Sequence, residues 1–425
     1  MRLIFSDDLT GACDVGAECI RSGWRVRVEF GGPAAWKSMQ LPGRGEIVVV
    51  DLETRRLSPR MAGKRAGDAG KAFGRRGIRP FFFKMDSTLR GNFVREAESL
   101  RNAVHAPLVW FVPANPAQGR WTVEGRVFVN GIPLERSAYA RDPLYPARTG
   151  EIPGYFPERK AARLLLHERL STGMRRSWIS RGVTNVSVDA TGDDDLQSAA
   201  KIIPQSDLVF GASPMAKFLA GRAPGNPRTR ARMGGRWPAC WRGRRVEPWA
   251  RRWRQRRLAS GGRWLGIFGS LNPLTTAQLK RAGKCRGTKV AWIGPEHLHG
   301  GREIAAPAGA RVWLVALNPG AFRYMREGGG SLGRGNRIAG ALGRISAQCM
   351  RNFSPDGLML SGGLTAMGVC ENLGITGLSL HEELSPGLVS SSALWKGPAL
   401  EIITKPGGFG AENALAETVA RIWRA

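Results

Sequence analysis

Leu3-Ile-Phe-Ser-Asp-Asp-Leu-Thr-Gly11 opens the chain with an apolar run, two adjacent carboxylates and a Thr-Gly turn. The apolar residues predict a buried strand, and Ala12–Ser22 predicts a helix that ends before Gly23. Open α/β sheets bind ligands where a strand gives way to a helix. Two like charges this close raise each other's pKa unless cations or hydrogen bonds compensate. The pair Asp7–Asp8 therefore indicates either a helix cap with a solvated neighbour or a ligand site, and the pairing favours the ligand site.

Strand–helix alternation continues along the chain and predicts an α/β fold with a mostly parallel sheet flanked by helices. In the first half the further predicted strands are Glu46–Asp51, Pro80–Lys84, Leu108–Val112 and Asp207–Gly211, and the further helices are Pro59–Phe73 and Phe93–Asn102. In the second half the predicted strands are Arg263–Phe268, Lys289–Ile293, Arg311–Ala316, Gly357–Leu360 and Leu400–Thr404.

The length of 425 residues exceeds what one hydrophobic core usually serves, so two domains are expected. Residues 221–263 break the pattern with 14 Arg against one Glu and several Trp. The predicted organisation is therefore a first domain over 1–220, an Arg/Trp-rich linker or insertion over 221–262, and a second domain over 263–425.

Composition narrows the class of protein. No apolar run approaches the roughly 20 residues of a membrane span, and the N-terminus lacks the pattern of a signal peptide. The six cysteines are scattered without a CxxC pair, which is typical of reduced thiols and predicts a cytoplasmic protein. With five His, a His-based metal site is not expected.

The formal charge of +30 comes mainly from Arg, since 12 of the 64 basic residues are Lys. A skew of this kind, spread along the chain, is typical of a GC-rich coding sequence. The charge predicts non-specific attraction to nucleic acid and other polyanions. It says little about the substrate.

The densest polar cluster, Lys84-Met-Asp-Ser-Thr-Leu-Arg90, follows an aromatic strand. Two cations, a carboxylate and hydroxyls at a strand end can clamp a carboxylate or phosphate and still offer a base. In the alternative interpretation Asp86 or Ser87 caps a helix that begins near Leu89. Asp51-Leu-Glu-Thr-Arg55 is a second strand end with an Arg.

A long irregular segment is predicted near residues 113–146. It contains Pro113-Ala-Asn-Pro-Ala-Gln-Gly-Arg120, several glycines and Asp142-Pro143. Loops of this length inside a domain are usually functional or disordered, and the aromatic content here favours function.

Three glycine-bearing strand ends stand out in the second half: Gly269-Ser270, Ser361-Gly-Gly-Leu-Thr365 and Lys405-Pro-Gly-Gly-Phe-Gly410. Glycines after strands let backbone N–H groups approach phosphates, and helix N-termini complete such a cradle. None of the three is a Walker A motif. Together they indicate phosphate binding in the second domain.

These segments, in this order, resemble the four-carbon acid sugar kinase family, whose members act on threonate, erythronate or 3-oxo-tetronate with ATP. The resemblance covers nearly the whole chain apart from about 221–262. It runs through Ser6-Asp-Asp-Leu-Thr-Gly-Ala12, Lys84-Met-Asp-Ser-Thr-Leu-Arg-Gly91, Pro113-Ala-Asn-Pro, Gly119-Arg120, Asp142-Pro143, Gly211-Ala-Ser213, Gly269-Ser270, Gly362-Gly363 with Thr365, Pro386-Gly387 and Lys405 with Gly407-Gly-Phe-Gly410.

The resemblance implies a first domain that holds the sugar acid, a second that holds ATP and Mg²⁺, and an active site in the cleft between them. The implied catalytic residues are Asp8, Asp86 and Lys84, with Asp7, Arg55, Ser87 and Arg90 as substrate-binding residues. The implied nucleotide contacts are Ser270, Gly362, Gly363, Leu364, Thr365, Gly407 and Gly408. Arg55, Lys84 or Arg90 is expected to pair with the substrate carboxylate, and either Asp8 or Asp86 to deprotonate the terminal hydroxyl. No metal-binding residue is assigned.

Two positions depart from the family's usual pattern. Leu364 stands where an acid is usual, and Pro406 where Ser is frequent. Because Pro406 has no N–H, the presumed phosphate loop loses one donor. A catalytically impaired kinase homologue is therefore an alternative.

Two other classes of protein were weighed. A nucleic-acid-binding protein could use the Arg and Trp residues of 221–263 for phosphate contact and base stacking. A phosphatase with an Asp nucleophile is excluded. Its usual pattern has a second acid two positions after the nucleophile, and in this chain Leu9 occupies that position after Asp7. The expected partners are thus a sugar acid and ATP, with a homo-oligomer left open.

Overall fold

The computed structural model describes residues 2–141, 146–165, 171–221, 262–299, 303–319 and 331–424. The chain divides into two compact units, Met1–Asn226 and Pro227–Ala425. Asp142-Pro143 and nearly all of the Arg/Trp-rich segment lie outside the described residues. The predicted cleft and the domain limits stay predictions.

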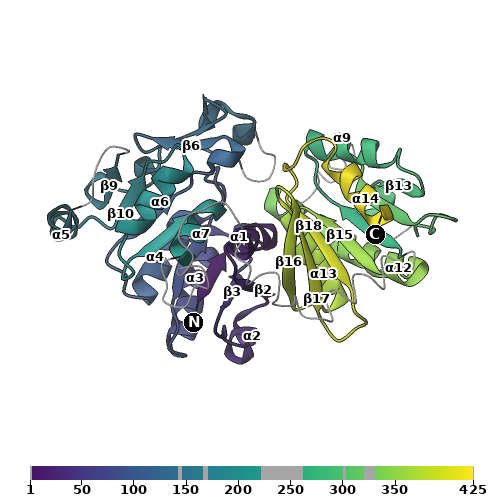
Figure 1. Ribbon diagram of the computed structural model, residues 1–425, viewed down its shortest axis with the longest axis horizontal. Coiled ribbons are helices and arrows are strands. Elements are labelled where there is room, and N and C mark those ends of the chain that lie inside the picture. Colours follow the sequence, from purple (N-terminus) through teal and green to yellow (C-terminus); the bar gives the residue numbers. More distant parts are fainter. Residues whose placement is uncertain are drawn as a thin grey trace, which may run out of the picture. The chain divides into compact units, whose positions relative to one another are not determined.

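The first unit is built on a parallel sheet with the strand order β2-β3-β1-β4-β11-β5-β10-β9 (Figure 1). Its strands are β1 (Leu3–Ser6), β2 (Arg25–Phe30), β3 (Glu46–Asp51), β4 (Pro80–Lys84), β5 (Val109–Val112), β9 (Ala161–Leu164), β10 (Asn185–Val188) and β11 (Leu208–Gly211). The central strands are buried along their length, as β1 and β5 illustrate. This burial follows from helices on both faces of a parallel sheet and explains the continuous apolar runs in the sequence.

Helices of the first unit are α1 (Leu9–Arg21), α2 (Pro33–Ser38), α3 (Pro59–Gly74), α4 (Phe93–Ala103), α5 (Thr172–Ser180), α6 (Asp193–Ile202) and α7 (Ser213–Gly221). Short 3-10 turns are η1 (Thr54–Arg56), η2 (Pro116–Gln118), η3 (Leu134–Arg136), η4 (Ala138–Arg141), η5 (Pro153–Tyr155) and η6 (Glu158–Lys160). Helix α3 packs against α4, and α1 against α7. Aromatic side chains fill the core, where Phe83 and Phe210 stack with ring centroids 4.2 Å apart.

Strand register brings the polar loops of the first unit to one edge of the sheet. Ser6 pairs with Asp51 on one side and with Lys84 on the other. Lys84 in turn pairs with Gly211, and Gly211 with Val112. Because these are the last residues of neighbouring parallel strands, the loops that follow them begin at the same level.

The prediction of an irregular segment over 113–146 is wrong for its middle part. Residues 120–133 form an antiparallel sheet of β6 (Arg120–Val123), β7 (Arg126–Val129) and β8 (Ile132–Pro133). Both connections are two-residue turns with positive φ at each residue, Glu124-Gly125 and Asn130-Gly131. Asn-Gly is a strong hairpin signal, so the sequence contained the information.

The second unit carries its own sheet with the order β13-β14-β12-β15-β18-β17-β16. Its strands are β12 (Trp264–Phe268), β13 (Thr288–Ile293), β14 (Val312–Leu317), β15 (Gly357–Ser361), β16 (Gly377–Ser385), β17 (Leu388–Leu394) and β18 (Glu401–Lys405). Its helices are α9 (Pro273–Ala282), α10 (Pro295–Leu298), α12 (Ser331–Phe353), α13 (Gly363–Leu373) and α14 (Ala414–Arg424). β17 runs antiparallel to both β16 and β18, and the other pairs are parallel.

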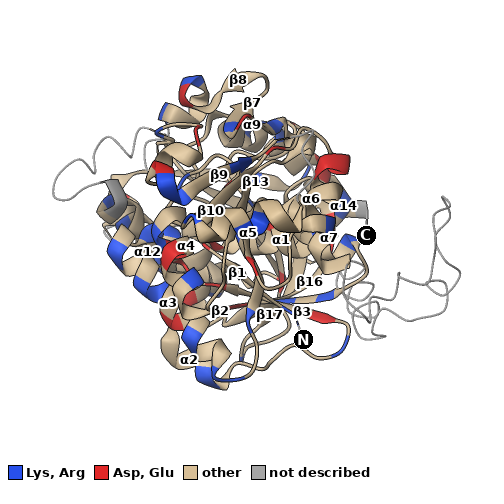
Figure 2. Ribbon diagram, turned by 90° about the vertical axis from the view of Figure 1, so that its left-hand side faces the viewer, with Lys and Arg blue, Asp and Glu red and all other residues tan. Residues whose placement is uncertain are grey.

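The predicted α/β class with mostly parallel sheets is confirmed. Strands Glu46–Asp51 and Pro80–Lys84 have the predicted limits. Helix α1 begins at Leu9, earlier than the predicted Ala12, because Asp8 caps it. No described helix is long and apolar enough to cross a membrane. Lys and Arg occur on many elements, α2, α3 and α12 among them (Figure 2).

Candidate functional site

The two carboxylates of the Asp7–Asp8 pair have different surroundings: Asp8 caps a helix, and Asp7 is buried. Asp8 accepts hydrogen bonds from the Gly11 N–H (2.7 Å) and the Thr10 hydroxyl (3.1 Å), and so caps α1. The capping interpretation therefore holds for Asp8. Its neighbour is not solvated, however, because Asp7 is 1% exposed. A buried carboxylate needs a partner.

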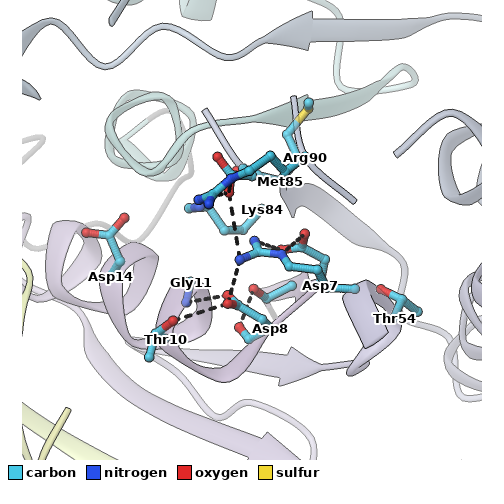
Figure 3. A network of polar contacts seen from close by, with 12 residues as sticks. Asp7, Asp8, Thr10, Gly11, Asp14, Thr54, Lys84, Met85 and Arg90 are labelled. Atoms are coloured by element: carbon cyan, nitrogen blue, oxygen red, sulfur yellow. Dashed lines mark hydrogen bonds and ion pairs between the residues drawn. The ribbon is translucent and has the colours of Figure 1, made fainter. Parts of the chain in front are cut away.

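Arg55 is that partner, and it joins three carboxylates. Figure 3 shows Asp7 and Asp8 within this network of polar contacts. Its Nε and Nη2 donate to the two oxygens of Asp7 at 2.9 and 2.8 Å. Its Nη1 donates to Asp8 Oδ2 at 2.6 Å and lies 3.8 Å from Asp86 Oδ2. The backbone N–H of Arg55 donates to the Asp7 carbonyl, which fixes the loop that carries Arg55. The guanidinium fork thus faces carboxylates from two other loops.

Asp86 is held by a local turn and by Arg90. Its Oδ1 accepts from the N–H and the hydroxyl of Thr88 at 2.7 and 2.6 Å. Its Oδ2 accepts from Arg90 Nε at 2.8 Å, with Nη2 at 2.6 Å. Leu89 has φ of 55° and α4 begins only at Phe93. The alternative in which Asp86 or Ser87 caps a helix starting near Leu89 is therefore wrong.

Asp7 and Asp86 have pKa values that are shifted in opposite directions. Burial raises the pKa of Asp7 to about 6, against the opposing effect of Arg55. Burial alone would also raise the pKa of Asp86, but Arg90 and Arg55 outweigh it and hold that pKa well below its ordinary value. Asp86 is therefore ionised at neutral pH and a weak base. The side chain of Asp8 is 14% exposed, against 7% for Asp86 and 1% for Asp7.

Lys84 and Ser87, the other predicted residues, lie in the same loop region. Both are buried, and the Lys84 ammonium donates to the Met85 carbonyl at 2.8 Å. Tyr139 connects the 113–146 segment to this region, because Arg90 and Arg120 stack on its ring at 5.2 and 5.4 Å. All seven predicted residues of the first unit thus come from the end of β4 or from the loops that follow β1, β3 and β4.

Glu96 is a residue of this cluster that the sequence reasoning missed. It is fully buried in the first turn of α4, and neither carboxyl oxygen has a hydrogen-bond partner among the described residues. The hydroxyl of Thr54 faces it. Burial, followed by the charge of Asp7, raises the pKa of Glu96 to about 8, so this acid is neutral at pH 7. Its position within the apolar stripe Phe93-Ala97-Leu100 was the available signal.

In the second unit the three glycine-bearing loops follow the adjacent strands β12, β15 and β18. Phe268 pairs with Ser361, and Ser361 with Lys405, so the loops begin at one level. They also touch. A Cβ on Gly269 would lie 2.2 Å from Thr365 Oγ1, and one on Gly407 would lie 2.4 Å from Ser270 Oγ. Only glycine permits this approach.

Helix α9 fixes one of these loops. Thr275 Oγ1 donates to the Gly407 carbonyl at 2.5 Å and lies at hydrogen-bond distance, 3.1 Å, from Ser270 Oγ. Gln278 Nε2 donates to the carbonyls of Phe409 and Ala411 at 3.1 and 2.8 Å. The nearest side-chain atom to a Cβ on Gly408 is Nδ2 of Asn272, the residue that caps α9.

The Gly362–Thr365 loop leads directly into α13. Gly362 has φ of 94° and donates its N–H to the Lys405 carbonyl at 2.9 Å. Gly363, Leu364 and Thr365 form the first turn of α13, which has no side-chain cap. An uncapped helix N-terminus offers N–H groups to an anion. The predicted nucleotide residues therefore share one sheet edge.

The described residues do not form a metal site by themselves. They contain no group of three or more His, Cys, Asp or Glu that could hold an ion. The three glycine-bearing loops supply hydroxyls and backbone groups but no carboxylate. These three loops therefore offer no carboxylate ligand to the expected Mg²⁺.

Two domain families match the chain. A sugar-binding N-terminal domain matches residues 3–219, and a nucleotide-binding C-terminal domain matches residues 265–415. A D-threonate kinase of Cupriavidus necator is 30% identical over 97% of this chain and 96% of its own length. A D-threonate kinase of Salmonella typhimurium is 24% identical, with 98% and 97% covered. A 3-oxo-tetronate kinase of Pseudomonas savastanoi is 25% identical, with 98% and 96% covered.

Solved structures share the fold. A Salmonella typhimurium protein, provisionally described as a tRNA synthase, superposes with a TM-score of 0.69 at 19% identity, covering 98% of each chain. A Haemophilus influenzae protein of the family DUF1537 has a TM-score of 0.65 at 18% identity, covering 99% of this chain and 100% of that one. At this identity the likeness concerns the fold alone.

Replacing Arg55 by Met should strongly destabilise the first unit. The substitution leaves Asp7 and Asp86 buried without their shared cation, which typically costs about 3–5 kcal/mol. Urea unfolding followed by tryptophan fluorescence measures the loss. The control Arg95→Met removes an exposed Arg paired with Glu98 and should change stability by less than about 1 kcal/mol. Equal effects of the two substitutions would contradict the role of Arg55.

Glu96→Gln should remove a pH-dependent part of stability. The folded-state pKa of about 8 lies above the ordinary 4.5, so folding takes up a proton between these values. The contribution is full below the unfolded pKa and is lost as pH rises through about 8. Wild-type stability relative to Glu96→Gln should therefore fall between about pH 4.5 and about pH 8 in urea unfolding and level off above that range. The control Glu98→Gln, at an exposed site on the same helix, should show no such trend. A difference independent of pH would refute a neutral Glu96.

Proposed function

The chain belongs to the four-carbon acid sugar kinase family, and we propose that it transfers the γ-phosphoryl group of ATP to the terminal hydroxyl of a four-carbon sugar acid. The carrying observation is the Arg55-centred cluster of Asp7, Asp8 and Asp86, which lies in the part of the chain matched by the sugar-binding family. Threonate, erythronate and 3-oxo-tetronate are the candidate substrates, since curated relatives carry the names D-threonate kinase and 3-oxo-tetronate kinase.

Asp8 is the proposed acceptor for the terminal hydroxyl of the sugar acid. It is the most exposed carboxylate of the cluster, and Arg55 and the α1 N-terminus fix its orientation. Asp86 is the weaker candidate because four donor contacts from Thr88 and Arg90 hold it ionised. Its proposed role is to position Arg55 and Arg90.

Lys84 is the proposed partner of the substrate carboxylate. Arg55 already commits its Nε, Nη1 and Nη2 atoms to the carboxylates of Asp7 and Asp8. Lys84 donates one hydrogen bond, to the Met85 carbonyl, and an ammonium carries three N–H groups. Ser87 and Arg90 complete the proposed substrate-binding set.

The nucleotide is proposed to bind the second unit, with its phosphates on the loops after β12, β15 and β18. Backbone N–H groups at the start of α13 and the glycine loops suit an anion. Phosphoryl transfer depends mainly on positioning and charge neutralisation, which such a cradle supplies. Mg²⁺ is proposed to arrive bound to the phosphates, because Mg²⁺ usually keeps waters and few protein ligands.

Asp8→Asn should lower kcat by roughly 10²-fold or more on the preferred substrate, because it removes the proposed proton acceptor. Asp86→Asn should raise KM more than it lowers kcat. A coupled ADP-release assay on threonate, erythronate and 3-oxo-tetronate measures both. The control Asp68→Asn alters an exposed pair with Lys64 and should leave turnover unchanged. Near wild-type kcat in Asp8→Asn would exclude Asp8 as the proton acceptor, and an unchanged KM in Asp86→Asn would exclude the positioning role of Asp86.

A catalytically impaired homologue is the second candidate, and Leu364 and Pro406 are the observations that favour it. Calorimetric titration with ATP distinguishes an active kinase from an impaired homologue, because an active kinase binds ATP and a chain that has lost the nucleotide site does not. A nucleic-acid-binding role for 221–263 is not proposed, since the curated relatives named above are kinases by name. Cytoplasmic localisation and oligomeric state stay predictions.

A further inference from the structure

Lys405 ends β18 at the edge that carries the three glycine-bearing loops. Its side chain is 3% exposed. Its backbone carbonyl accepts the Gly362 N–H, and it pairs in register with Ser361 on β15. Lys405 thus connects the loop after β18 with the loop that begins α13. The sequence analysis placed Lys405 at the start of a predicted phosphate-binding loop but assigned no role to its side chain.

The ammonium of Lys405 has carbonyl partners and no carboxylate partner within the described residues. Its Nζ donates to the carbonyls of Pro406 and Gly407 at 3.0 and 3.1 Å. An ammonium has three N–H groups, so these bonds leave one. A buried cation without a counter-ion is unfavourable. Burial lowers the pKa of Lys405 to about 7, and no charged side chain contributes to this shift.

The surroundings of Lys405 favour an anion. Helix α13 begins beside it, and its N-cap residue, Gly362, has no side chain that could accept from the first N–H groups of that helix. The hydroxyl of Ser361 is fully buried and has no hydrogen-bond partner in the part of the chain that the structure describes. No acid occurs in the adjacent loops, where Leu364 occupies the position of the family's usual carboxylate. A cation, an uncapped helix and a buried donor therefore lie at one edge.

Pro406 fits the same arrangement. Its missing N–H deprives the loop of a donor, yet its carbonyl accepts from both Lys405 Nζ and the Phe409 N–H. The proline thus holds the lysine in place at the start of the turn.

We propose that Lys405 is the residue that neutralises the polyphosphate of the bound nucleotide, gaining a proton as the phosphates bind. The inference rests on the proposed function and names the group of the second unit that discriminates nucleotides by their phosphates. Adenosine, which lacks phosphates, does not engage it. AMP, ADP and ATP engage it increasingly as their phosphates reach the loop after β18.

The test is calorimetric titration of the intact protein with adenosine, AMP, ADP and ATP near pH 8, in two buffers of different ionisation enthalpy. Wild-type protein should take up close to one proton on binding ATP, because Lys405 is mostly neutral before binding, and none on binding adenosine. Lys405→Met should lose the uptake and bind ATP about 10- to 100-fold more weakly, with adenosine unaffected. Lys405→Arg, which is always charged, should bind ATP without uptake.

Lys280→Met is the matched control, since Lys280 is an exposed lysine on α9 of the same unit. It should bind ATP as the wild type does. ATP binding by wild-type protein without proton uptake, or unchanged ATP affinity in Lys405→Met, would overturn the role of Lys405 and leave the proposed kinase intact. Wild-type protein that binds no nucleotide at all would overturn both. The wild-type measurement needs no variant, so misfolding of Lys405→Met does not obscure the result.

Discussion

The first unit depends on one buried guanidinium. Arg55 pairs with both oxygens of Asp7, with Asp8, and at longer range with Asp86. Without a cation, carboxylates this close and this buried would be driven to protonate. With it, Asp86 stays ionised and Asp8 is oriented at the surface of the cluster. Glu96 keeps its proton at pH 7 and so adds no further buried negative charge.

In both units the parallel register of the strands brings loops that are distant in sequence to the same edge of the sheet. In the first unit the last residues of β1, β3 and β4 pair with one another, which brings Asp7, Arg55 and Asp86 together. In the second, the ends of β12, β15 and β18 pair in the same way, and glycines let the following loops touch. The first edge is rich in paired charges, while the second has backbone donors and a single buried cation. This contrast suits a sugar acid in one unit and a polyphosphate in the other.

The sequence predicted the elements that have strong local signals. Apolar runs gave the strands around EIVVVD and PFFFK, and polar strand ends gave Asp7, Arg55, Lys84 and Asp86. Four features escaped prediction from the sequence. The hairpins over 120–133 have short strands whose Asn-Gly turn was overlooked. The fork of Arg55 and the burial of Glu96 depend on tertiary packing, which spacing along the chain does not reveal. The depressed pKa of Lys405 likewise follows from burial alone.

Phosphorylation of a four-carbon sugar acid at its terminal hydroxyl is the activity proposed for this chain. Phosphorus NMR of the products formed from ATP with D-threonate, erythronate and 3-oxo-tetronate tests it most directly. The account predicts ADP and one phosphate ester whose signal is split by the two protons of a terminal CH₂–O–P group. An ester on an internal hydroxyl, or no ester from any four-carbon acid by protein that binds ATP, would contradict it.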